Sequence, residues 1–259
     1  MTTNYPNNPI DLNALDWIEG VKQEDYSAAS GKVQVYFKDL ERALLKHIDE
    51  AGSVIGCVAW LTLSSILEAL ARRSAVSLLV QKEDWLRVDT DANGRPVGRK
   101  TSLRTQIAKL RKSNARWFDL DNRLYFGDNW VPADDGQGII PAQVQIDPIR
   151  CVGPYSDARN KVHPRMHHKF LVFCHAVQHQ DHPGSKKRRI ARPYAVWTGS
   201  FNITSNATRS FENAVVIRDE VIADAYMKEW AQLMAFSEPL DWSSKEPCGD
   251  MDFGGFWSS

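Results

Sequence analysis

The segment RMHHKFLVFC (165–174) places two histidines and a lysine at the start of an apolar run. Because side chains alternate between the two faces of an extended strand, His167 and Lys169 share one face and His168 lies on the other. An imidazole beside an ammonium suits an anionic substrate, since lysine binds the anion and imidazole acts as a nucleophile or as an acid and base near neutral pH. Taken alone, the segment fits a pair of histidines that simply ends a strand equally well.

A second segment, TGSFNITSNATRSFENAVVI (198–217), places a glycine–serine turn directly after another apolar strand. Gly199 allows close approach of the backbone, and Ser200 and Asn202 offer neutral hydrogen-bonding groups. Glu212, just before the next strand, can orient an imidazole. The two segments in this order favour an anion-binding catalytic site over a chance pair of histidines.

The order H-x-K, then G-S-x-N, then E-N-A-V-V-I resembles the phospholipase D superfamily, and within it the small bacterial nucleases that carry a single H-x-K motif. The resemblance is specific over 162–236, weaker over 32–81, and absent over about 85–160 and in the tail. It implies a phospholipase D-like fold, which is an α/β fold with a mixed, partly parallel central sheet flanked by helices.

The functional residues of that family correspond to five positions of this sequence. His167 corresponds to the catalytic histidine and Lys169 to the phosphate-binding lysine. Ser200 and Asn202 correspond to residues that line the phosphate pocket, and Glu212 to the carboxylate that holds the histidine. The implied reaction is phosphodiester cleavage through a phosphohistidine intermediate, and it requires no metal and no cofactor.

The family needs two H-x-K motifs in each active site, because one histidine attacks phosphorus while another protonates the leaving oxygen. This chain contains one H-x-K motif. The resemblance therefore implies a homodimer with one composite site across the two-fold axis. His167 of one subunit would attack, and His167 of the other would act as the acid and then as the base for water.

The sequence departs from the family motif H-x-K-x4-D at Cys174, where the family has aspartate. Strand alternation puts position 174 on the face opposite His167 and Lys169. We therefore expect the missing carboxylate to affect local support more than the chemistry of the site, although loss of activity stays an open alternative.

Strands that alternate with amphipathic helices surround these motifs and predict an α/β fold with a partly parallel sheet. We expect a single catalytic domain over 1–236, with an inserted segment at about 85–160, followed by an acidic, aromatic tail over 237–259. The predicted strands cover 32–37, 53–60, 75–81, 115–120, 167–174, 194–200 and 213–217, and the predicted helices cover 38–51, 62–73, 101–115 and 220–236.

Two basic runs suggest tracks for a phosphate backbone, although a run of charges also fits a solvated surface. The segment from Arg95 to Arg116 holds eight Lys or Arg residues and no acid, and KKRRIAR (186–192) lies in a predicted loop, 175–193, beside the proposed site. The expected partner is nucleic acid, with DNA favoured over RNA. The candidate contacts are Arg104, Lys109, Arg111, Lys112, Arg116, Lys186, Lys187, Arg188 and Arg189.

Composition is ordinary for a globular chain of 259 residues, with 43% hydrophobic and 25% charged residues and a formal net charge of zero. The four cysteines are scattered without a C-x-x-C pair, which favours free thiols in a reducing compartment. The N-terminal residues lack the pattern of a signal peptide, and the longest apolar stretch, 53–63, is too short to cross a bilayer. These features predict a cytoplasmic protein that does not bind a membrane.

Two motifs of metal-ligand type are discounted. The segment DTDANG (89–94) opens like a calcium loop, but its twelfth position is Lys100, where calcium needs a glutamate. The segment CHAVQHQDH (174–182) contains zinc-ligand types at a spacing that matches no standard finger. We expect no metal site.

Two functional alternatives stay open. A lipid phosphodiesterase or phosphatidyl transferase would use the same site chemistry. A catalytically inactive nucleic-acid-binding module would account for Cys174 as a sign of decay. Salt-sensitive DNA binding without cleavage, not repaired by Cys174→Asp, would favour the inactive module.

Overall fold

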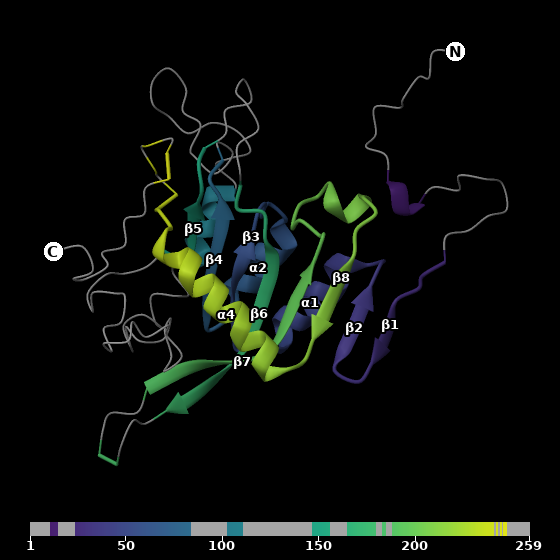
Figure 1. The fold of residues 1–259 in the computed structure, drawn as a ribbon. Coiled ribbons are helices and arrows are strands. Elements are labelled where there is room, and N and C mark those ends of the chain that lie inside the picture. The colour runs from purple at the N-terminus through teal and green to yellow at the C-terminus, as the bar shows by residue number, and fades with distance from the viewer. Residues whose placement is uncertain are drawn as a thin grey trace.

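The computed structural model describes residues 11–14, 24–83, 103–110, 147–155, 165–179, 183–184, 188–240, 242, 244 and 246–247. The described residues form one eight-stranded sheet with the strand order β1-β2-β8-β7-β6-β3-β4-β5 (Figure 1). The elements are β1 (Ala28–Ser30), β2 (Val33–Tyr36), α1 (Leu40–Glu50), β3 (Ser53–Val58), α2 (Ser64–Ala71), β4 (Ala75–Gln81), β5 (Ile149–Val152), β6 (Lys169–His179), β7 (Arg188–Gly199), β8 (Ala214–Ile217) and α4 (Glu220–Ala235).

The sheet is mixed. The pairs β3–β4 and β4–β5 are parallel, and the other neighbouring strands are antiparallel. Both faces are covered, because α1, α2 and the helical residues 103–110 pack on one side and α4 packs on the other (Figure 1). The predicted mixed, partly parallel sheet flanked by helices is confirmed.

The faces of β6 follow the predicted alternation. Leu171 and Phe173 belong to the core under α1 and α2, whereas Phe170 and Val172 belong to the core under α4. All four side chains are buried. Because both faces of the strand carry apolar residues, a continuous apolar run appears in the sequence instead of a polar–apolar alternation.

The described residues of the segment 175–193 do not form a loop beside the site, which was the prediction from the sequence. They form the distal part of a hairpin, in which β6 and β7 stay paired from Phe170↔Thr198 out to His179↔Arg188. Ten residue steps along a strand cover about 33 Å, so the outer end of β6 lies far from its start, and the outer part of the two strands projects from the rest of the sheet (Figure 1). The prediction that the basic run lies directly beside His167 was therefore wrong for its described residues, 188–192.

The strand β5 lies within the segment predicted to be an insertion, yet it is the edge strand of the central sheet. The residues after α4 pack along it. Glu238 forms a bridge with Cys151, and the guanidinium of Arg150 donates to the Ser237 hydroxyl and carbonyl oxygens. The start of the predicted tail is thus held against β5.

A buried ion pair adds to this anchor. The ammonium of Lys82, fully buried at the end of β4, donates to Glu238 Oε1 at 2.6 Å and to the Glu246 carbonyl at 2.8 Å. It also lies 4.9 Å from the centre of the Trp242 ring. Removing one member would leave a charge buried without a partner, which is strongly destabilising.

A buried histidine links stability to pH. His47 of α1 is 2% exposed, and its Nε2 lies 2.9 Å from the Tyr36 hydroxyl. Burial, together with the positive charge of Arg218, lowers the pKa of His47 to about 4. The unfolded chain, in which the pKa is near 6.5, therefore takes up this proton first as the pH falls.

We expect His47→Gln to weaken the acid sensitivity of folding. The stability that His47 contributes is fully present above about pH 6.5 and is lost as the pH falls toward 4, so about 2–3 kcal/mol of it has been lost at pH 4.5. Urea unfolding at pH 7 and pH 4.5 measures it. Between those values the free energy of unfolding should fall by that much more in the wild type than in the variant. Equal losses would contradict the assignment.

Candidate active site

His167 and Lys169 meet where β6 begins. The Lys169 ammonium lies 3.1 Å from His167 Nε2 and 3.1 Å from the His167 carbonyl oxygen. Desolvation, followed by the charge of Lys169, lowers the pKa of His167. Desolvation also lowers the pKa of Lys169, against the opposing effect of the Glu212 carboxylate. The imidazole is thereby held neutral at pH values where a free histidine would already be partly protonated, which is the form that a nucleophile needs.

Trp60 completes this side of the site. Its ring meets the His167 ring edge to face, with centroids 5.7 Å apart and an interplanar angle of 82°, and the Lys169 ammonium lies 6.0 Å from its centre. The sequence analysis missed Trp60. The contact follows from the antiparallel pairing of β3 with β6, where Val58 faces Lys169, and no local pattern in the sequence reveals that pairing.

Ser200 and Glu212 form a second cluster on the neighbouring strands β7 and β8. Ser200 Oγ donates to Glu212 Oε2 and accepts from the Asn213 N–H at 3.0 Å, while the Ser200 N–H donates to the Asn213 carbonyl at 3.1 Å. Gly199 makes this approach possible, because a Cβ there would lie 2.3 Å from the Asn213 carbonyl oxygen. The resemblance implied that Glu212 holds His167. In this chain the Glu212 carboxylate instead accepts from the Ser200 hydroxyl.

The register of the sheet brings the two clusters together. Phe170 pairs with Thr198, so Lys169 at the start of β6 lies beside Gly199 at the end of β7. The turn after β7 is in turn attached to the residues after β3, because the Ile203 N–H donates to the Trp60 carbonyl at 3.1 Å. Residues next to the ends of β3, β6, β7 and β8 therefore come together on the same side of the sheet, where these strands begin or end.

Asn202 lies in the turn between Ser200 and Ile203, and its side chain has incomplete hydrogen bonding. Its backbone carbonyl accepts from the Thr204 N–H at 2.8 Å, but its side-chain Oδ1 is buried and has no hydrogen-bond partner within the described ranges. A buried polar atom without a partner costs free energy. Because this oxygen accepts and does not donate, the amide nitrogen is the group of Asn202 that can bind an anionic oxygen.

His168 points away from the site. Its Nε2 lies 3.2 Å from the Glu229 carboxylate of α4, and its ring packs edge to face on Phe170. The adjacent histidines thus occupy opposite faces, as the alternation predicted.

Cys174 lies on the α4 side of β6, fully buried among apolar residues that include Val172 and Trp230. Burial raises the pKa of its thiol. Five residue steps along a strand correspond to about 16 Å from Lys169. The prediction that position 174 faces away from His167 and Lys169 is confirmed.

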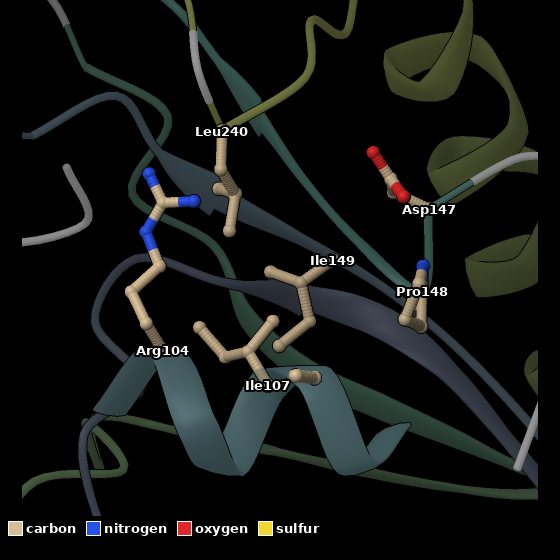
Figure 2. A pocket seen from close by; sticks show the side chains of 7 residues that line it. Arg104, Ile107, Asp147, Pro148, Ile149 and Leu240 are labelled. Carbon is tan, nitrogen blue, oxygen red and sulfur yellow. The ribbon is translucent and has the colours of Figure 1, made fainter. Parts of the chain in front are cut away.

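The basic candidates that the structure describes lie away from this site. Arg104, on the helix 103–110, lines a small pocket with Asp147, Ile149 and Leu240 against β5, which is separated from β6 by β3 and β4 (Figure 2). Lys109 is exposed on the same helix. Arg188 and Arg189 lie in β7 toward the hairpin tip, and only their backbone is described; Arg111, Lys112, Arg116, Lys186 and Lys187 lie outside the described residues.

No cluster of three His, Cys, Asp or Glu side chains suited to a metal ion occurs in the described part of the chain. Cys174 is buried, whereas the adjacent His175 is exposed and stacks on Tyr194 with ring centroids 4.2 Å apart. His182 and the side chain of His179 lie outside the described residues, as do the segment 89–94 and the predicted strand 115–120. Among the helices that are described, none is long and apolar enough to cross a membrane.

Several known proteins are similar to this chain. Uncharacterized protein L381 of Acanthamoeba polyphaga mimivirus is 25% identical over 226 residues, which cover 86% of this chain and 73% of that protein. One similar solved structure is the phospholipase D family member Nuc from Salmonella typhimurium, with a TM-score of 0.43 and 18% identity, covering 82% of this chain and 98% of that chain. Another is NucT from Helicobacter pylori, with a TM-score of 0.43 and 12% identity, covering 80% of this chain and 98% of that chain. Residues 44–234 match the family described as "Cardiolipin synthase, PLD-like domain". The chain belongs to the phospholipase D superfamily, with a PLD-like domain over these residues.

Proposed function

We propose that the chain is a cytoplasmic, metal-independent phosphodiesterase that cleaves nucleic acid, DNA in preference to RNA, through a site shared by two copies of the chain. One observation carries the proposal: a neutral imidazole and an ammonium lie 3.1 Å apart at the end of β6. A phosphate oxygen can bind the ammonium while phosphorus lies within reach of the imidazole.

In the proposed reaction His167 attacks phosphorus, so that an N–P bond forms as the bond from phosphorus to the leaving oxygen breaks. The Lys169 ammonium and the Asn202 amide N–H groups donate to the non-bridging oxygens and stabilise the charge that moves onto them. Ser200, whose hydroxyl donates to Glu212, lines the pocket. The leaving oxygen takes a proton from a second imidazolium. Water then attacks phosphorus, gives its proton to that second imidazole and releases His167.

The second imidazole would come from another copy of the chain. Among the histidines whose side chains are described, His47 is buried in the core, His168 pairs with Glu229 on the α4 side, and His175 stacks on Tyr194 in the hairpin. None of these can serve as the partner of His167. A two-fold axis close to His167 would supply an identical imidazole.

The basic hairpin supports nucleic acid as the substrate. The strand β7 begins with two arginines and carries an exposed Arg192 before it returns to the site. A hairpin of this length can follow a phosphate backbone well beyond the scissile bond. Glu212 would hold Ser200 in place beside the phosphate pocket.

The test is one preparation assayed with EDTA present on a single-stranded oligonucleotide, a duplex, an RNA of the same sequence and vesicles of phosphatidylcholine and cardiolipin. We expect cleavage of at least one of the two DNA substrates, no loss on chelation and no release of lipid headgroups. Activity confined to the vesicles would support the lipid phosphodiesterase instead. Loss of all cleavage with EDTA would contradict the metal-independent mechanism.

A further inference from the structure

We infer that Trp60 is a stacking platform for an unpaired nucleobase next to the scissile phosphate, and that it makes the site selective for single strands. The inference rests on the proposed function, because it assigns the substrate class of that same site. It adds a binding residue that lies outside the H-x-K and G-S-x-N segments.

The exposure of Trp60 is the first observation. Trp197, Trp230 and Trp242 are 2%, 0% and 4% exposed, whereas Trp60 is partly exposed, and these four are the tryptophans within the described ranges. A large aromatic ring left in contact with solvent beside polar groups is typical of a binding surface. Among these four, the one tryptophan that is partly exposed to solvent is Trp60, beside His167.

Reach is the second observation. The indole lies 5.7 Å from the His167 ring and 6.0 Å from the Lys169 ammonium, measured at its ring centre. A phosphate bound at those two groups is one sugar away from the base of its own nucleotide. The indole is therefore within reach of that base without any movement of the phosphate.

The backbone that carries the ring is held on both sides. The Ala59 N–H donates to the His168 carbonyl at 2.9 Å, and the Trp60 carbonyl accepts from the Ile203 N–H at 3.1 Å. Little ordering is then needed when a base binds, which favours affinity.

Stacking on an indole selects for unpaired strands. Inside a duplex both faces of a base are covered by its neighbours, so a protein ring reaches a base face only in a single strand or after the base has been unstacked. All four bases have a π face, so such a platform tolerates any sequence.

The test measures binding, so that cleavage does not interfere. In a His167→Asn background, Trp60→Ala, Trp60→Phe and the control Tyr26→Ala are titrated by anisotropy against a short labelled DNA strand and a strand of equal length with abasic sugars. Tyr26 is 71% exposed and precedes β1, at the far edge of the sheet from β3. Thermal unfolding and mass in solution are measured for each variant.

We expect Trp60→Ala to weaken binding of the base-bearing strand by about 10- to 100-fold and to leave binding of the abasic strand unchanged. Trp60→Phe should restore part of the loss, and Tyr26→Ala should bind as the parent does. With His167 intact, Trp60→Ala should raise KM on the DNA strand with a much smaller effect on kcat.

Three results would overturn the inference: unchanged binding of both strands, an equal loss on both strands, or a change of mass in Trp60→Ala, which would make Trp60 a contact between copies. These results are independent of turnover. A parent protein that cleaves no nucleic acid, yet shows the base-dependent loss, would reject the proposed function and retain the stacking site.

Discussion

Replacing His167 with asparagine is expected to lower kcat/KM for phosphodiester cleavage by at least about 1,000-fold, because the attacking atom is removed. The side chain is exposed and lies outside both apolar clusters, so the fold should persist with an unchanged melting temperature. Initial rates on a fluorescent oligonucleotide in EDTA measure the effect.

The matched control is His168→Asn. The neighbouring histidine has the same chemistry, but it contacts Glu229 and Phe170 on the other face of the strand. This variant should keep its rate within a few-fold of the wild type. If the two substitutions lower the rate equally, or if His167→Asn keeps its activity, the proposed nucleophile is wrong.

Mixed assemblies extend this test to the shared site. When wild-type and His167→Asn chains are refolded together in equal amounts, a site that needs His167 from both copies leaves about one quarter of the activity. Chains that act independently would leave about one half. The second result would contradict the composite site while leaving the role of His167 intact.

Restoring the family's aspartate by Cys174→Asp is expected to destabilise the fold by about 3 kcal/mol or more at neutral pH, without a gain in activity. The position is fully buried beneath α4, and burial there raises the pKa of the native thiol, which shows how poorly the site tolerates negative charge. Ser53, opposite Cys174 in the register, offers one hydroxyl donor, whereas a buried carboxylate needs several.

The sign of the pH dependence follows from the same burial. A carboxyl whose pKa is raised by folding binds its proton more tightly in the folded state, so the penalty is largest at high pH and shrinks as the pH falls through the raised pKa. Urea unfolding at pH 5 and pH 8 measures this.

Cys174→Ala is the matched control. It removes the sulfur without adding charge and should cost only about 1 kcal/mol, independent of pH. If Cys174→Asp has wild-type stability and cleaves faster, the prediction is wrong, and position 174 affects the chemistry of the site.

Much of the fold follows from local patterns. The apolar run 75–81 matches β4 residue for residue, and the helix predicted at 220–236 matches α4 within one residue. The first is a continuous apolar run, and the second is an amphipathic helical segment. At the first turn of α4 the Asp219 side chain also accepts from the Val221 and Ile222 N–H groups. Patterns of this kind depend on neighbours in the chain, so they can be seen without the tertiary structure.

Other elements could not be predicted in this way. β1 and β5 contain three and four residues, which is too short for a period to appear. The outer half of the β6–β7 hairpin mixes polar residues with a few apolar ones, so neither a continuous apolar run nor a clean alternation marks its strands in the sequence. Pairing between strands is a property of the assembled sheet.

By itself, the sequence determined the order of the motifs, the shared face of His167 and Lys169 and the opposite face of Cys174, because strand alternation is local. Only the tertiary structure decided that Glu212 bonds to Ser200, that Trp60 lies against His167, and that residues 188–192 of the basic run lie in the outer part of the β6–β7 hairpin. These depend on which strands pair and in what register. Contacts between residues far apart in the chain are set by the register of the whole sheet and by no single segment.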